Sequence, residues 1–154
     1  MISVMRWNSW AICALLIVAA VAGNSQTAVC PDFDGGAIDD HYSLEDAAKA
    51  RRFLADLKAA IHQDNKIQIG SMMLYPFLVG SGTGQNTVRR EIRNQAQFLA
   101  AYPTIITAGV RNSVESQNPE CLFAIKEGIM IGNGVVWFRL QPDGKFKIIS
   151  MVAN

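Results

Sequence analysis

The strongest hydrophobic pattern in the chain is helical and begins at Leu44. From there to about Gln63, apolar side chains recur three or four positions apart, at Ala50, Phe53, Leu54, Leu57 and Ile61. Ser43 lies three residues before Asp46, which fits a capping box, and an acidic first turn suits the positive end of the helix dipole. The pattern predicts that Leu44 to about Gln63 is the longest helix of the protein.

The next apolar stretch fits both helical and strand periodicity in part, and a proline decides between them. Pro76 disfavours helical dihedral angles at the residue before it and cannot continue a helix. We therefore expect a short helix near Ile67–Met73 and an extended segment over Tyr75–Val79. The glycine-rich Gly80–Gln85 then predicts a hairpin loop that leads to a short strand, Thr87–Ile92.

Two short helices are expected in the middle of the chain. Asn94 can cap a helix that runs through Ala101, with Phe98, Leu99 and Tyr102 pointing inward. Pro103 is well placed to open a second short turn or helix, because proline suits the first helical position.

The last third of the chain changes to the period of β-strands. Apolar residues alternate at Cys121, Phe123 and Ile125, and turn signals stand at Gly132-Asn133-Gly134 and Pro142-Asp143-Gly144. These signals separate three further strands: Gly128–Ile131, Val135–Leu140 and Phe146–Val152. An antiparallel meander that follows helices predicts an α+β fold, with short helices and a curved antiparallel sheet packed on the long N-terminal helix.

The first 22 residues have the pattern of a secretory signal peptide. They carry one charge, Arg6, and their apolar run of about a dozen residues ends in Ala20-Val21-Ala22, a small-residue cleavage site. A spanning helix needs roughly 20 apolar residues. We therefore expect cleavage after Ala22 and a periplasmic or secreted protein, with an extended arm over residues 23–41 and a single domain over residues 42–154.

The charge balance argues against two classes of partner. Of the 14 Lys and Arg residues only Arg6 lies in the leader, so the exported chain carries 13 basic and 13 acidic residues. We expect no nucleic-acid partner and no membrane attachment after cleavage. Arg89, Arg90 and Arg93 form the densest basic cluster and Asp32–Asp40 the densest acidic one. Such runs usually form solvated faces, but a protein ligand would be sought there first.

The cysteines predict a disulfide bond. Cys13 leaves with the leader, so Cys30 and Cys121 remain in an oxidising compartment. A Cys30–Cys121 bond would stabilise the fold by roughly 3–4 kcal/mol in the chain-entropy model. Two free thiols, or a lipid on Cys30, are the alternatives.

Three motifs resemble the nuclear transport factor 2-like superfamily, over about Leu44 to Val152. They are Leu74-Tyr75-Pro76-Phe77 after the long helix, the spacing Phe98…Tyr102…Ile105, and Gly128-Ile129-Met130-Ile131-Gly132 followed by Val136-Trp137-Phe138. The chain is most similar to small exported bacterial members. The resemblance implies a cone-shaped, cystatin-like fold with a cavity between the long helix and the concave sheet face. It fixes no activity, because the superfamily includes isomerases, dehydratases, binding modules and toxin-neutralising proteins.

The lining of that implied cavity predicts a ligand site. Tyr75, Tyr102 and Trp137 combine a large apolar body with one polar end, and such a cage suits a small, mostly apolar ligand. Arg139 alternates with Trp137, so it lies on the same sheet face and can grip a carboxylate if that face lines the cavity. The alternative is that the three aromatic residues belong to the core and that Arg139 is solvated.

No reaction is specified by the remaining polar residues. An isomerase or lyase would need an acid or base in the cavity, for which the candidates are Asp64, Glu91, Glu127 and His62. Of these, Asp64 or Glu127 would act with Tyr75 or Tyr102. Each candidate has the sequence context of a solvated or ion-paired side chain. His41 and His62 are too far apart in sequence to form a metal pair on one helix face, and we expect no cofactor.

These observations predict an exported, non-enzymatic binding protein. It would engage a small apolar ligand, or a protein partner across its sheet, and an immunity or inhibitor role suits the compartment. Val135–Phe138 is apolar on both sides, so a homodimer through the sheet is also expected, as in the superfamily. The alternative is a ketosteroid-isomerase-like isomerase or lyase that acts on a small apolar substrate.

Overall fold

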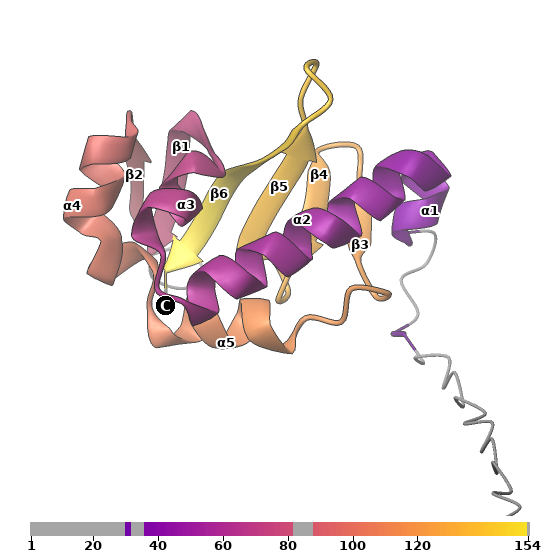
Figure 1. Ribbon diagram of the computed structural model, residues 1–154, viewed down its shortest axis with the longest axis horizontal. Helices are drawn as coiled ribbons and strands as arrows, with labels where there is room; N and C mark the ends of the chain where they lie inside the picture. The colour runs from indigo at the N-terminus through magenta and orange to yellow at the C-terminus, as the bar shows by residue number, and fades with distance from the viewer. Residues whose placement is uncertain (1–29, 32–35, 82–87, 154) are drawn as a thin grey trace, which may run out of the picture.

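The computed structural model describes residues 30–31, 36–81 and 88–153. The fold is α+β, as the sequence predicts, and its sheet is not closed into a barrel (Figure 1). The elements follow the chain in the order α1 (Ile38–His41), α2 (Leu44–His62), α3 (Lys66–Ser71), β1 (Met73–Ser81), β2 (Val88–Ile92), α4 (Gln95–Ile105), α5 (Ala108–Ser116), β3 (Phe123–Ile125), β4 (Gly128–Ile131), β5 (Val136–Leu140) and β6 (Phe146–Ala153).

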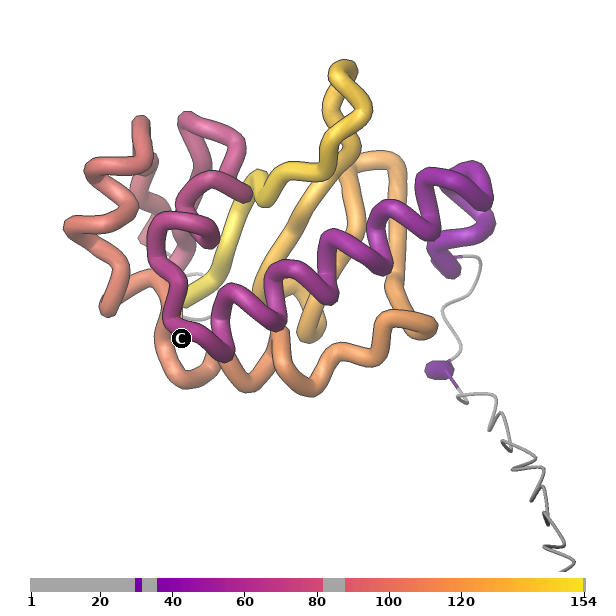
Figure 2. The backbone as a smooth tube through the Cα atoms, viewed as in Figure 1, coloured from indigo at the N-terminus to yellow at the C-terminus, as the bar shows by residue number. Residues whose placement is uncertain are grey.

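The sheet has six strands in the order β2-β1-β6-β5-β4-β3. Neighbouring strands are antiparallel except β1 and β6, which run parallel. The expected meander is correct for β3 to β6, but a wholly antiparallel sheet is wrong. Turn signals specify only strands that are adjacent in sequence, whereas β6 returns from the end of the chain to lie between β5 and β1. Figure 2 shows this path, with the β5–β6 hairpin projecting beyond the sheet.

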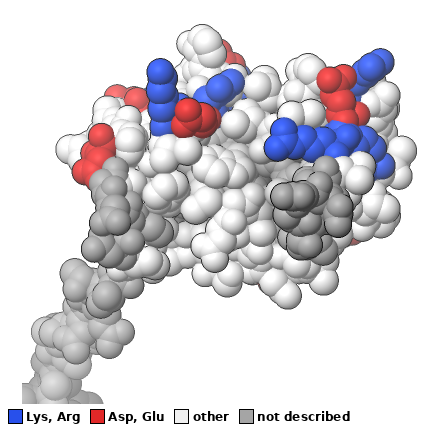
Figure 3. All heavy atoms as spheres, turned by 180° about the vertical axis from the view of Figure 1, so that it is seen from behind, with Lys and Arg blue, Asp and Glu red and all other residues white. Residues whose placement is uncertain are grey.

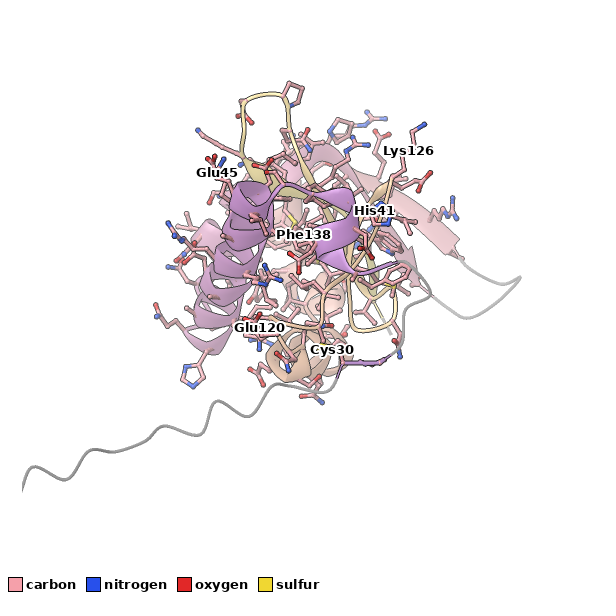
Figure 4. The ribbon with its side chains drawn as sticks, turned by 90° about the vertical axis from the view of Figure 1, so that its right-hand side faces the viewer. Cys30, His41, Glu45, Glu120, Lys126 and Phe138 are labelled. Carbon is pink, nitrogen blue, oxygen red and sulfur yellow. A yellow bond between two sulfur atoms is a disulfide. The ribbon has the colours of Figure 1, made fainter. Side chains whose placement is uncertain are left out.

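Helix α2 crosses one face of the sheet (Figure 1). The Ser43 side chain accepts a hydrogen bond from the backbone N–H of Asp46, which gives the helix its expected N-cap. The apolar stripe of α2 is buried, and Phe53 stacks on Phe138 of β5 with ring centroids 5.0 Å apart. Phe138 lies beside α2 in Figure 4. This face of the sheet is therefore the helix-covered face, and the hydrophobic core lies between the two layers.

One helix boundary differs from the prediction. Pro103 does not open a second helix but lies inside α4, and α5 begins later, after Thr107, whose hydroxyl accepts from the backbone N–H of Val110. Pro103 has no N–H to donate within the helix, but the buried side chains of Tyr102 and Ile105 on either side of it hold the last turn of α4 against the core.

The end of the arm is more structured than the extended chain that we expected. Ile38–His41 forms one helical turn, Ile38 is buried, and Ala37 makes an isolated bridge to Phe123 of β3. Burial of Ile38 and pairing of Ala37 with the edge strand β3 therefore order this segment. The predicted disulfide is present, with the Cα atoms of Cys30 and Cys121 5.1 Å apart, and it ties the arm to the residues that precede β3.

The predicted signal peptide, residues 1–22, lies outside the described residues, as do residues 23–29 of the arm. Within the described ranges, no helix combines the length and the apolar character that crossing a membrane requires.

Candidate functional site

The two faces of the sheet differ in what covers them. Side chains alternate along a strand, and on β5 Val136 and Phe138 are buried on the helix-covered face. Trp137 and Arg139 therefore point to the opposite face. We call this the open face, because no described helix packs across it (Figure 1).

A row of mostly apolar side chains crosses the open face from strand to strand. The register pairs Leu78 with Ser150, Ser150 with Trp137, Trp137 with Met130, and Met130 with Phe123. The Leu78 side chain is 43% exposed, and the other four are half-buried. In Figure 3 the charged side chains gather toward the upper edge of this face, and its middle is white. A contiguous apolar surface with a charged rim is typical of an interaction site.

Two cavities border this row, and a third, which shares no residue with it, lies where β3 and β5 end. The first, which we call the tryptophan cavity, measures about 380 Å³ and is lined by Leu78, Gly80, Arg89, Gly134, Trp137, Ser150, Met151 and Val152. The second, the disulfide cavity, measures about 300 Å³ and includes Pro31, Cys121, Phe123 and Met130. The third, the basic cavity, measures about 390 Å³ and is lined by His41, Tyr42, Ile125, Lys126, Arg139 and Leu140. Apolar side chains can enter such hollows, as the anchors of protein interfaces do.

The four predicted ligand-binding residues do not line one cavity. Tyr75 lies on the helix-covered side, where its hydroxyl donates to the carbonyl oxygen of Gly70 at 2.9 Å and burial raises its pKa to about 12. Tyr102 is also buried among the helices, on α4. Trp137 and Arg139 lie on the open face, and they line two different cavities there. The aromatic cage therefore does not form as one site, and ligand binding by each residue stays a prediction.

The enzyme alternative required a carboxylate within hydrogen-bonding distance of a tyrosine. Among the described residues, Asp64 and Tyr102 are the one candidate pair that meets this requirement. The tyrosine hydroxyl donates to Asp64 Oδ1 at 2.8 Å, and the Arg111 guanidinium donates to both groups. Arg111, and then Tyr102, lower the pKa of Asp64, while burial raises the pKa of Tyr102 to about 12. A carboxylate held ionised by a guanidinium is a weak base and no acid, so the geometry favours a structural link between the end of α2, α4 and α5.

The other acid–base candidates lie apart from one another. Glu91 forms an ion pair with Arg93 at 3.0 Å, and Glu127 is exposed in the turn between β3 and β4. His62 is exposed at the end of α2. In the part of the chain that the structure describes, no group of three or more His, Cys, Asp or Glu side chains could hold a metal ion.

Sequence reasoning missed the residues that make the open face a site. Leu78 and Met130 join Trp137 only through the order of the strands, which no local pattern specifies. The alternation of Phe123, Met130 and Trp137 along their own strands was visible, and it could have placed them on one face once the hairpins were assigned.

Comparison of the chain with protein-family models, with curated proteins and with solved structures gave no match. The resemblance to the nuclear transport factor 2-like superfamily therefore remains a prediction from the residue pattern.

Proposed function

We propose that this chain is an exported, non-catalytic binding protein that docks a protein partner on the open face of its sheet. The observation that carries the proposal is the cross-strand row Leu78, Ser150, Trp137 and Met130, left uncovered by the described helices. Leaving a surface of this kind in water is unfavourable, and a partner that covers it gains the hydrophobic free energy of burying it.

Several features support a protein over a small apolar molecule. Trp137 lines one cavity and Met130 another along the row, and the basic cavity adds a third hollow where β3 and β5 end, so together they offer a broad surface. Central aromatic and methionine side chains with a polar rim are common in protein interfaces. The leader pattern and the disulfide support export. Membership of the nuclear transport factor 2-like superfamily, and an inhibitor or immunity role, are part of the same proposal.

Position-specific photo-crosslinking in the producing cell tests the proposal. A photoreactive residue at position 78 or 152 lies on the open face, whereas one at position 56 lies on exposed α2 and is the matched control. We expect covalent adducts with a discrete protein from positions 78 and 152 and none from position 56. Adducts that form equally from all three positions, or from position 56 alone, would contradict docking on the open face.

A further inference from the structure

The charges around the open face specify the chemistry of its partner. Arg89 lines the tryptophan cavity, and Lys126 and Arg139 line the basic cavity. The linings of the three cavities contain no carboxylate among the described residues. Cations therefore lie at two places, Arg89 on the open face and Arg139 with Lys126 where β3 and β5 end, although the exported chain as a whole has equal numbers of basic and acidic residues.

The two arginines are available to a ligand. Neither the guanidinium of Arg89 nor that of Arg139 has an ion pair or a hydrogen bond within the described ranges. Arg139 is paired in register with Lys147 on the neighbouring strand, but the Lys147 ammonium donates to the carbonyl oxygen of Ser71 at 2.6 Å. Arg139 is therefore the cation of this pair that remains available to a ligand.

The carboxylates near the face do not neutralise it. Glu91 shares the register row of Leu78, but it is already paired with Arg93. Acidic side chains gather instead on α1 and at the start of α2, where Asp39 pairs with Arg51 and Asp46 with Lys49. Glu127 follows Lys126 in the turn between β3 and β4, and Figure 3 shows acidic side chains among the basic ones at the upper edge of the face. The part without described carboxylates is therefore the lining of the cavities that Arg89 and Arg139 border.

We infer that the partner on the open face is an acidic protein segment, which inserts an apolar side chain beside Trp137 and places carboxylates on Arg89 and Arg139. This inference rests on the proposed function. Apolar contact at the centre supplies affinity, and arginine is suited to a carboxylate because its planar fork can form two parallel hydrogen bonds. Complementary charge at the rim adds specificity and speeds association.

The same charges disfavour a second copy of this chain as the occupant. A two-fold interface brings the same patch of both subunits together. Two open faces would then bring the cations of Arg89 and Arg139 toward one another, and the described linings of their cavities supply no carboxylate to face them. The homodimer expected from the sequence therefore becomes an alternative outcome of the test.

An unbiased peptide selection tests the inference. The whole chain, expressed with its leader and purified, is used to select binders from a phage-displayed library of short random peptides. We expect the enriched peptides to combine large apolar residues with Asp or Glu. Their affinity should fall by about tenfold or more in Arg89→Glu/Arg139→Glu, because both cations are replaced by like charges.

Two further variants locate the binding and control for net charge. Arg52→Glu/Lys145→Glu makes the same charge change at exposed positions away from the open face, and it should leave binding unchanged. Trp137→Ser should abolish binding of the enriched peptides. Thermal unfolding followed by circular dichroism verifies that each variant is folded, and the exposed arginine pair keeps the test valid if Trp137→Ser does not fold.

Each other outcome contradicts a defined part of the account. The enriched peptides could be neutral or basic, bind less to Trp137→Ser and bind equally to Arg89→Glu/Arg139→Glu. That result would overturn the inference and leave the proposed function standing. A concentration-dependent dimer that Trp137→Ser dissociates would identify a second copy as the occupant, with the same consequence. Peptides insensitive to all open-face variants, or no enrichment at all, would overturn both.

Discussion

Removing the disulfide should strongly destabilise the protein. Cys30 and Cys121 are 91 residues apart in the sequence, and for a loop of this length the chain-entropy relation gives about 4.6 kcal/mol at 25 °C. The structure adds a local effect, because Pro31, the residue after Cys30, forms part of the wall of the disulfide cavity. We therefore expect Cys30→Ser/Cys121→Ser to lower the free energy of unfolding by about 3–5 kcal/mol.

Urea denaturation followed by circular dichroism measures this change. The oxidised protein and the double serine variant are unfolded in parallel, and the free energies are extrapolated to water. Dithiothreitol should destabilise the parent protein by a similar amount and leave the double variant unchanged, which separates loss of the bond from side effects of the serines. A loss below about 1 kcal/mol, with unchanged slopes, would refute the reasoning that this bond restrains the unfolded chain.

Three further predictions concern particular side chains. Tyr102→Phe removes a donor to Asp64, so the pKa of this carboxyl should rise toward its usual value, as a nuclear magnetic resonance titration would show. The pKa of Asp64 is lower in the folded than in the unfolded protein, so its ionised carboxylate stabilises the fold above the unfolded-state pKa. This stabilisation is lost as pH falls through the folded-state pKa. Tyr102→Phe makes the stabilisation smaller, so acid should unfold this variant at a higher pH than the parent protein. Gly132→Ala should destabilise by about 1–3 kcal/mol in chemical denaturation, because φ is +59° and an added Cβ would lie 2.5 Å from Ser113 Cβ. Gly144→Ala, at φ +77° with no atom within 4 Å of the added Cβ, should cost less, and an equal cost would refute the steric explanation.

Local chemistry made several elements predictable. The start of α2 follows from the Ser43 cap, and β4 and β5 are joined where Gly132, Asn133 and Gly134 all have positive φ. Glycine and asparagine tolerate these angles better than other residues do, so these three residues are enough to predict the turn. The disulfide followed from the cysteine count and from the oxidising compartment that the leader pattern predicts.

The candidate site depended on contacts that local chemistry does not specify. The parallel pairing of Met73 with Ile148 joins distant parts of the chain, and it brings Leu78 into line with Trp137 through Ser150. The strand around Trp137 is apolar on both sides, so the pattern alone could not decide which face the helices cover. The cavity expected between helix and sheet was therefore assigned residues from two opposite faces.

The pairing of Tyr102 with Asp64 is a further contact of this kind. The two residues are 38 positions apart, and only the packing of α4 against the end of α2 brings them together. The sequence made Asp64 a candidate base, but its protonation state depends on Arg111, which was not among the candidates. A carboxylate's role is set by its neighbours in space, and these were not predictable before the fold was known.

The emission of Trp137 gives the most direct test of docking on the open face. Trp7 and Trp10 leave with the expected leader, so Trp137 is the sole tryptophan of the cleaved chain, and it lies half-buried in the middle of the row. The crosslinked partner, or a selected peptide, should shift its emission to shorter wavelength and protect it from quenching by acrylamide, because docking removes it from water. Saturating binding that leaves both the emission and the quenching of Trp137 unchanged would contradict the account.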